Sequence, residues 1–197
     1  MPRAGLTTED VVTAAAVLAD EVGYQDLTMG MLAQRLGVRT PSLYKHVDDL
    51  ADLRHRLATK ATTELGEAIR DALQGRSGRD ALAGLLTATR SYVTAHPGRY
   101  AATIGAEFTG PADPLLAAST RVIDSIAAVL RGYGISERDM SHAIRTVRCT
   151  IHGFAVLQAA RGFQWSGDPD DTFAWMTSFI DRGLRGAQSL AAAGEPG

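Results

Sequence analysis

The sequence predicts an all-α protein of about nine helices. Along its 197 residues, apolar side chains recur at intervals of three and four positions, which is the spacing of one face of a helix. The strict alternation of apolar and polar residues that marks a half-buried strand is absent. Helix-start pairs, in which a Ser or Thr is followed three positions later by an acid, recur between the apolar stretches.

The first helix is predicted to begin after Thr7 and to end at Gly23. Thr7 and Asp10 have the spacing of a capping box, in which each side chain accepts a hydrogen bond from the backbone amide of the other residue. Leu6 and Val11 flank this start as a hydrophobic staple. One face of the helix carries the residues expected to be buried: Val12, Ala15, Ala19 and Val22.

Two further helices, joined by a tight turn, are predicted between Thr28 and Val47. Thr28 is the expected N-cap of the first, and Gly37 supplies the positive φ that ends it. The second helix is short, with Thr40 as its expected N-cap and Pro41 as its first helical residue, because the fixed φ and missing N–H of proline suit that position. This order is the helix-turn-helix arrangement. The residues expected to be buried in it are Leu32, Ala33, Leu36, Val38 and Leu43.

The rest of the chain is predicted to form further helices separated by glycine and proline breaks. They run from Asp49 to the Gly75–Gly78 break, from Ser77 to His96, over Leu115–Arg131, from Ser136 to about Ala160, and from Asp168 onward, with a short helix or irregular piece over Arg99–Phe108. The tail, residues 191–197, is predicted to be disordered.

The composition indicates where the protein acts. The net charge is −2 and the sequence pI is near 6.2, so the overall charge does not point to nucleic acid. Cys149 is the only cysteine, which excludes an internal disulfide and fits a reducing compartment. No secretory signal pattern opens the chain, and no run of roughly 18 apolar residues occurs in it. We therefore expect a cytoplasmic protein, neither secreted nor anchored in a membrane.

The charges are distributed unevenly, with a basic window inside the predicted helix-turn-helix. Between Leu27 and Val47 the chain carries Arg35, Arg39 and Lys45 and no acid. The side chains left exposed once the buried positions are removed can all hydrogen-bond: Arg39, Thr40, Ser42, Tyr44, Lys45 and His46. Hydroxyl groups suit phosphate oxygens, and the guanidinium of Arg39 could read guanine. These residues predict DNA binding, whereas the packing pattern alone also fits an ordinary helical hairpin.

Residues 7–57 resemble the DNA-binding domain of the TetR family of transcriptional regulators. The resemblance rests on Leu27-Thr28 through Ala33, on Gly37-Val38, on the run Pro41-Ser42-Leu43-Tyr44-Lys45-His46-Val47, and on Leu53. It implies DNA contacts by Thr28, Thr40, Pro41, Ser42, Tyr44 and His46. With the two cations, the predicted DNA-binding set is Thr28, Arg39, Thr40, Pro41, Ser42, Tyr44, Lys45 and His46. Leu50 departs from the pattern, because family members usually have a phosphate-holding lysine there.

The resemblance also implies an organisation and a function. Residues 1–50 would form the helix-turn-helix DNA-binding domain, and residues 51–190 a C-terminal helical domain for ligand binding and dimerisation. The implied protein is a homodimeric repressor that binds a palindromic operator in double-stranded DNA and is released by a small-molecule ligand. Activation instead of repression stays open. His152-Gly153 further resembles the Trp-His-Gly motif of one C-terminal subtype, although Ile151 stands where the tryptophan would be.

Dimerisation is expected through the last two helices, because their apolar residues exceed what one small domain needs to bury. These residues are Met140, Ile144, Val147, Ile151, Phe173, Met176, Ile180 and Leu184. Trp175 and Phe179 are expected to serve either the dimer or the core.

Ligand-binding residues are predicted among the aromatic and polar side chains of the C-terminal domain: Tyr92, His96, Tyr100, Phe108, Cys149 and His152. Trp165 could line the same pocket, and each of these residues could be a core residue instead. Cys149 and His152 lie one helical turn apart and could form a nucleophile and its base, or could bind metal together with His142 and Arg145. No oxyanion donors or second ligand cluster can be named, so core packing is favoured, and we expect no enzyme, metal site or cofactor. A protein-interaction module with a degenerate helix-turn-helix is the other alternative.

Overall fold

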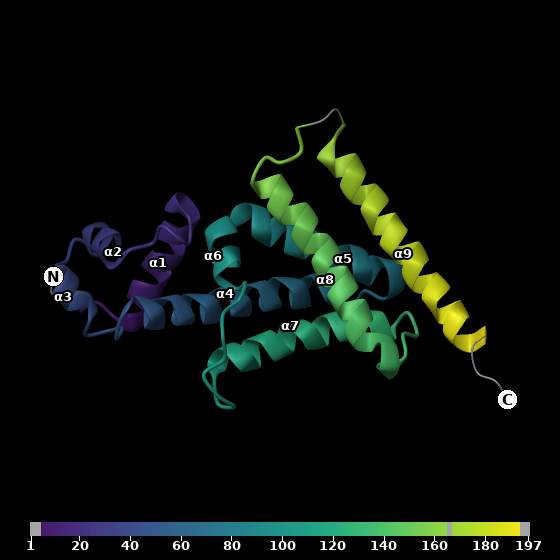
Figure 1. The fold of residues 1–197 in the computed structure, drawn as a ribbon, viewed down its shortest axis with the longest axis horizontal. Coiled ribbons are helices and arrows are strands. Elements are labelled where there is room, and N and C mark those ends of the chain that lie inside the picture. The colour runs from purple at the N-terminus through teal and green to yellow at the C-terminus, as the bar shows by residue number, and fades with distance from the viewer. Residues whose placement is uncertain (1–4, 165–166, 194–197) are drawn as a thin grey trace. The chain divides into compact units, whose positions relative to one another are not determined.

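The computed structural model describes residues 5–164 and 167–193, and every regular element within these ranges is a helix (Figure 1). The helices are α1 (Thr8–Val22), α2 (Met29–Leu36), α3 (Thr40–Leu43), α4 (Leu50–Leu73), α5 (Gly78–Ala95), α6 (Pro97–Ala102), α7 (Pro114–Arg131), α8 (Glu137–Ala159) and α9 (Pro169–Ala193). The all-α prediction is confirmed. None of the described helices combines the length and the apolar character that crossing a membrane requires.

Two expectations concern residues at the edge of the described ranges. α9 continues to Ala193, past the predicted start of the tail at residue 191. The remainder of that tail, residues 194–197, lies outside the described residues, and so does Trp165.

The chain divides into two compact units. Unit 1 comprises the residues up to Glu64 together with His96–Ser119, and unit 2 comprises Leu65–Ala95 and the chain from Thr120 onward. Unit 1 is longer than the predicted domain of residues 1–50. The reason is that Leu53, Leu57, Ala102 and Leu115 join the core that α1, α2 and α3 build.

Local hydrogen bonds set the ends of α1 and α2 as predicted. Thr7 Oγ1 accepts from the Asp10 amide at 3.1 Å, and Asp10 Oδ2 accepts from the Thr7 amide at 2.9 Å, which completes the capping box. The Met31 amide donates to Thr28 Oγ1 at 3.2 Å, so Thr28 caps α2. Gly37 ends α2 with a φ of 66°, the left-handed conformation that glycine adopts without a steric penalty.

α3 begins one residue earlier than predicted. Its N-cap is Arg39, and no side chain provides a capping hydrogen bond there. The Ser42 amide donates to the Arg39 carbonyl at 2.8 Å, so the first turn already starts at Arg39. The predictions that Thr40 is the N-cap and that Pro41 is the first helical residue are therefore both wrong by one position: Thr40 is the first residue of α3, and Pro41 is the second, still within the first turn.

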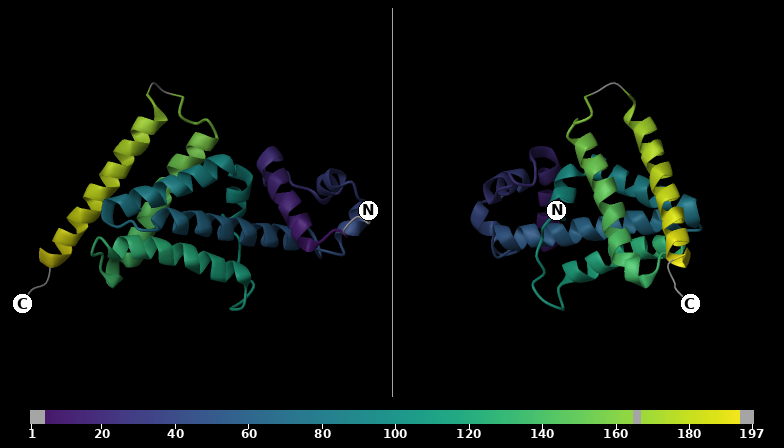
Figure 2. Two further views of the ribbon diagram at one scale, coloured as in Figure 1. Left: turned by 180° about the vertical axis from the view of Figure 1, so that it is seen from behind. Right: turned by 45° about the vertical axis from the view of Figure 1, so that its right-hand side comes forward.

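Unit 2 is built around α5, which packs against both α8 and α9. α8 and α9 lie side by side in Figure 1 and in both views of Figure 2. Ser136 caps α8 as predicted, because its hydroxyl accepts from the Asp139 amide at 3.2 Å. The buried residues include Leu82, Leu85, Leu86 and Val93 of α5, Val147, Ile151 and Phe154 of α8, and Met176 and Ile180 of α9.

The expectation that the last two helices carry more apolar residues than one domain can bury is wrong. Most of the residues that were expected to exceed the needs of one domain are buried within the single chain: Met140, Val147, Ile151, Met176, Ile180 and Leu184. They face neighbouring helices of unit 2, which periodicity alone does not identify. Trp175 and Phe179 are large apolar residues of α9 that are exposed, with 62% and 57% of their surface accessible, so they do not belong to the core. Their rings stack on each other with centroids 5.3 Å apart.

Asp113 fixes the start of α7 within unit 1. Its buried carboxylate accepts hydrogen bonds from the Thr109 and Leu115 amides, both at 2.8 Å, and from the Thr109 hydroxyl at 3.0 Å. His55 Nε2, on α4, lies 3.0 Å from Asp113 Oδ1. The hydrogen bond from the Thr109 amide is the largest of the effects that hold the pKa of Asp113 well below its usual range, and these effects outweigh burial.

We predict that Asp113→Asn lowers the thermal midpoint at pH 7 by roughly 5 °C, because an amide cannot accept all of these hydrogen bonds. A lowered carboxyl pKa stabilises the fold above the unfolded value of about 3.9, and this contribution is lost as the pH falls towards the folded value. The variant should therefore lose less stability than the wild type between about pH 4 and pH 2. Circular dichroism melts over this range measure the effect. Asp124→Asn, on an exposed face of α7, is the control, and equal shifts for both variants would contradict the assignment.

Candidate nucleic-acid interface

The helix-turn-helix is held together by a turn at Gly37 and by a fully buried apolar seam. The Val38 amide donates to the Ala33 carbonyl at 3.0 Å, and the Gly37 amide donates to the Gln34 carbonyl at 3.1 Å. These bonds close the end of α2 and direct the chain into α3. Leu32, Leu43 and Val47 are buried almost completely in the core of unit 1. The two helices and their turn are therefore fixed from the inside.

The predicted DNA-binding residues are all accessible to solvent. Thr28, Arg39, Pro41, Tyr44 and Lys45 are exposed, and Thr40, Ser42 and His46 are half-buried. Tyr44 has 52% of its surface accessible, which is unusual for a large aromatic side chain that has an apolar core nearby. Apart from Thr28, these side chains lie on α3 or within one turn of it, so they form one short polar surface, which we call the reading surface.

The cations of this segment have different surroundings. Arg35 makes two hydrogen bonds to the Glu21 carboxylate, one of them 2.9 Å long, so its charge is balanced by α1. Arg39 and Lys45 are exposed at the two ends of α3. Two positive side chains with hydroxyl groups between them can contact phosphates and base edges at once.

The acids that follow the reading surface have roles in starting α4. Asp49 Oδ1 accepts from the Asp52 amide at 2.8 Å, and Asp52 Oδ2 accepts from the Asp48 amide at 3.0 Å. Burial alone would raise the pKa of Asp52, but hydrogen bonds from Arg56 and from the Asp48 amide lower it on balance. Leu50 is partly buried against the core of unit 1, so it serves packing where a lysine would face outward.

Three predicted ligand-binding residues fall in unit 1. Tyr100 is buried, and Phe108 is exposed, with 52% of its surface accessible. His96 is half-buried, and its Nδ1 lies 3.3 Å from the Asp20 carboxylate of α1.

The other three fall in unit 2, where Tyr92 is buried, His152 is half-buried and Cys149 is exposed. The prediction that Cys149 packs in the core is therefore wrong, because the buried face of α8 is formed by Val147, Ile151 and Phe154 instead. His142 and Arg145 are also exposed. Among the described residues, no group of three or more His, Cys, Asp or Glu side chains is placed to hold a metal ion.

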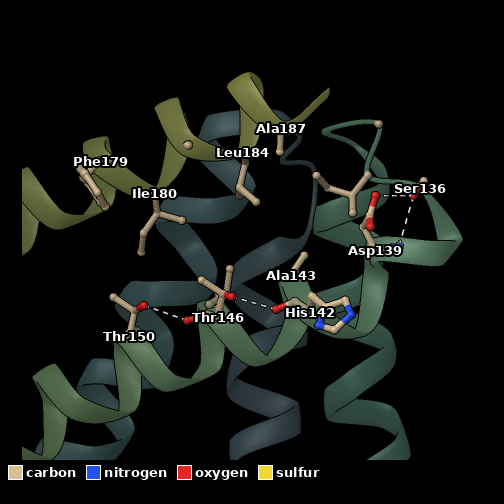
Figure 3. A pocket seen from close by; sticks show the side chains of 14 residues that line it. Ser136, Asp139, His142, Ala143, Thr146, Thr150, Phe179, Ile180, Leu184 and Ala187 are labelled. Carbon is tan, nitrogen blue, oxygen red and sulfur yellow. Dashed lines mark hydrogen bonds between the residues drawn. The ribbon is translucent and has the colours of Figure 1, made fainter. Parts of the chain in front are cut away.

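An apolar groove between α8 and α9 was not predicted from the sequence (Figure 3). Its volume is about 400 Å³, and its apolar walls come from Ala143 and Val147 of α8 and from Phe179, Ile180, Gly183, Leu184 and Ala187 of α9. The hydroxyls of Thr146 and Thr150, which also line it, donate to backbone carbonyls of their own helix. The small residues at 143, 183 and 187 were the available signal, since they leave space between neighbouring helices.

Two family models match the chain. Residues 11–55 match the model described as "Bacterial regulatory proteins, tetR family", and residues 82–180 match the one described as "Tetracyclin repressor-like, C-terminal domain". The first range contains the reading surface, and the second contains α8 and part of α9.

Related proteins match over nearly the whole chain. The uncharacterized HTH-type transcriptional regulator Rv0681 of Mycobacterium tuberculosis is 33% identical over 182 residues, which is 92% of this chain and 83% of the relative. The structure of BioQ with its natural double-stranded DNA operator has a TM-score of 0.62 and 25% identity, covering 92% of this chain and 99% of that one. A TetR variant from Acinetobacter baumannii AYE in complex with minocycline has a TM-score of 0.68 and 23% identity, with 94% and 98% covered.

Proposed function

Since the chain belongs to the TetR family of bacterial transcriptional regulators, we propose that it is a dimeric repressor that binds a palindromic operator and is released by a small molecule. The observation that carries the DNA-binding role is the reading surface, a cluster of exposed and half-buried side chains, most of them able to hydrogen-bond, on or beside a short helix held by a buried seam. The operator complex of BioQ, which has the same fold, supports this role. The protein would act in the cytoplasm, where bacterial genes are transcribed.

Each predicted DNA-binding side chain suits one kind of DNA contact. Arg39 is proposed to reach guanine O6 and N7 in the major groove, where a guanidinium can bond both atoms at once. Lys45 and the hydroxyls of Ser42 and Tyr44 are proposed to hold phosphates, which fix the register without reading sequence. Thr40 and Pro41 offer apolar atoms to a thymine methyl group. Thr28 and His46 are proposed as additional phosphate contacts.

The dimer is proposed to form through α8 and α9. Trp175 and Phe179 stack on each other and are exposed to solvent on α9. Val156 and Leu157 are exposed on α8, and the apolar groove between the two helices lies open beside Phe179. Exposed aromatic side chains next to an apolar groove are typical of a protein interface. Two copies that cover these residues would present two reading surfaces to half-sites about 34–36 Å apart.

The effector is proposed to bind in unit 2, which the tetracycline-repressor-like model matches over residues 82–180. A structure with this fold holds minocycline, which supports a small-molecule effector of some kind. Release would follow if the effector binds better to a conformation in which the two reading surfaces no longer fit the half-sites. We propose binding and release as the activity of this protein, without a catalytic step.

The DNA-binding role is tested by selecting duplexes from a random pool with the wild-type chain and measuring the affinity of variants for the selected duplex. Tyr44→Ala should weaken binding by about 1–3 kcal/mol, or roughly 5- to 150-fold. The helical signal should not change, because Tyr44 is exposed. Phe108→Ala is the matched control, since Phe108 has the same exposed fraction in the same unit. A Tyr44→Ala protein with wild-type affinity would refute the assigned surface.

The dimer is tested with Phe179→Asp, because Phe179 is exposed in the single chain and its loss should spare the core. Sedimentation velocity should show a dimer for the wild type and monomers for the variant. Ile104→Asp introduces the same charge at an exposed position of unit 1 and should leave the dimer intact. A monomeric wild type, or a dimeric Phe179→Asp protein, would remove this interface from the account.

A further inference from the structure

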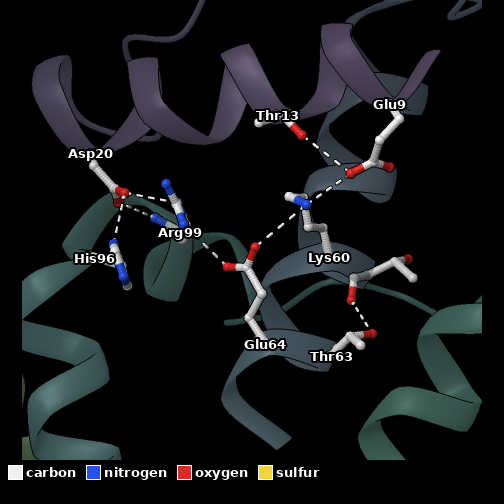
Figure 4. A network of polar contacts seen from close by, with 9 residues as sticks. Glu9, Thr13, Asp20, Lys60, Thr63, Glu64, His96 and Arg99 are labelled. Atoms are coloured by element: carbon white, nitrogen blue, oxygen red, sulfur yellow. Dashed lines mark hydrogen bonds and ion pairs between the residues drawn. The ribbon is translucent and has the colours of Figure 1, made fainter. Parts of the chain in front are cut away.

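α1 carries acidic side chains near both ends, and both are engaged by cations from other helices of unit 1 (Figure 4). Asp20 lies near the C-terminal end of α1 and contacts α6, and Glu9 lies in its first turn and contacts α4. They are eleven positions apart, which is about three helical turns, so they lie on the same face of the helix.

The Asp20 carboxylate contacts the start of α6 at three points. Its Oδ1 accepts a hydrogen bond from the Arg99 amide at 2.8 Å, which satisfies one of the unpaired donors in the first turn of α6. Its Oδ2 lies 2.9 Å from Arg99 Nε and 3.3 Å from His96 Nδ1. The side chains of Asp20 and Arg99 are only 15% and 17% exposed, so water screens their charges weakly.

Gly98 allows the backbones of α6 and α1 to touch. A Cβ atom at this position would lie 1.9 Å from the Ala19 carbonyl oxygen and 2.6 Å from the Asp20 amide nitrogen. No larger residue fits without moving one helix, because the atoms in the way are backbone. The Asp20 contacts therefore add to a backbone packing contact that is already tight. Together they define the relative position of α1 and α6 narrowly.

Arg99 also connects this contact to α4. Its Nη1 donates to Glu64 Oε2 at 3.3 Å. Glu64 Oε1 lies 3.5 Å from Lys60 Nζ, and Lys60 Nζ donates to Glu9 Oε1 at 2.9 Å. The chain of contacts starts on α1 at Asp20, passes through Arg99 and α4, and returns to α1 at Glu9. It holds α1 at both ends.

α1 in turn holds the helix-turn-helix. The Thr8 hydroxyl donates to the backbone carbonyl of His46, a residue of the reading surface, at 3.3 Å. Glu21, the residue after Asp20, accepts two hydrogen bonds from Arg35 of α2. Two adjacent carboxylates of α1 thus bind different partners: Asp20 binds α6 and Glu21 binds α2. α1 is therefore in contact with both α6 and the helix-turn-helix.

We propose that Asp20 and Arg99 are positioning residues for DNA recognition, which act through α1 to set the orientation of the reading surface. This inference rests on the proposed function, because it assigns their effect to operator binding. When the contact is lost, α1 samples several positions, and only a fraction of molecules present the reading surface correctly. The apparent dissociation constant then rises by the inverse of that fraction.

The test compares Arg99→Met and Asp20→Asn with Arg131→Met, which removes the same charge from an exposed ion pair of unit 2. Affinities are measured for the selected duplex and for an unrelated duplex of equal length, at one salt concentration and well below the melting temperature. We expect about tenfold weaker binding of the selected duplex by the first two variants, with the unrelated duplex within about twofold of wild type. The double variant should bind the selected duplex no more weakly than Arg99→Met alone, because both substitutions remove the same contact.

A purely structural role would lower the melting temperature without changing the ratio of the two affinities. The inference is overturned if Arg99→Met and Asp20→Asn keep that ratio, or if Arg131→Met changes it equally. If Arg99→Met does not fold, the affinity ratio of Asp20→Asn is the test. The asparagine Oδ1 can still accept a hydrogen bond from the Arg99 amide, so this variant keeps the cap of α6.

Hydrogen exchange separates this inference from the proposed function. Amides of α1 and α2 should exchange about tenfold faster in Arg99→Met than in Arg131→Met. If the wild-type chain selects no duplex, the proposed function fails. The exchange comparison then tests by itself whether the Asp20–Arg99 contact holds α1 in place. Faster exchange in α1 and α2 supports this role of the contact, and unchanged exchange overturns it.

Discussion

The burial of Leu43 and Val47 in the core of unit 1 is the interaction on which the reading surface depends. α3 has four residues, has no side-chain cap, and is far too short to be stable as an isolated helix. It persists because these two side chains share the core with α1 and α2, and because the Thr8 hydroxyl binds the His46 carbonyl. Tyr44 and Lys45, which lie between the two buried residues, are directed outward as a result. The same packing that stabilises the segment therefore exposes its hydrogen-bonding groups.

Several acidic side chains of unit 1 hold secondary structure in place or pair with a cation. Within the described segment 28–47, two cations form no ion pair. Asp49 and Asp52 accept backbone amides at the start of α4, and Glu21 balances Arg35. Arg39 and Lys45 are left exposed beside the hydroxyls. A protein with a net charge of −2 can thus present a locally basic surface to DNA while repelling it elsewhere. Leu50, which stands where the family resemblance implies a lysine, is partly buried against the core and brings no positive charge to this arrangement.

Most features set by neighbouring residues could be predicted from the sequence, although the N-cap of α3 was placed one residue too late, and features set by distant residues could not. Thr7, Thr28 and Gly37 were assigned correctly because their hydrogen bonds and dihedral angles are local. Cys149 was misplaced, since periodicity identifies the faces of α8 but not the face that another helix covers. The contacts Asp20–Arg99 and His55–Asp113 join residues 79 and 58 positions apart, and no local pattern predicts them. The groove between α8 and α9 likewise depends on how two helices pack.

The reading surface is proposed to enter the major groove of a twofold-symmetric operator, and methylation interference tests this geometry most directly. Dimethyl sulfate modifies guanine N7 in the major groove and adenine N3 in the minor groove, so one reaction probes both. On a duplex selected by the wild-type chain, we expect N7 methylation to block binding in two clusters about one helical turn apart. Methylation at N3 should be tolerated. Interference confined to adenine N3, or a single cluster without a symmetric counterpart, would contradict the account.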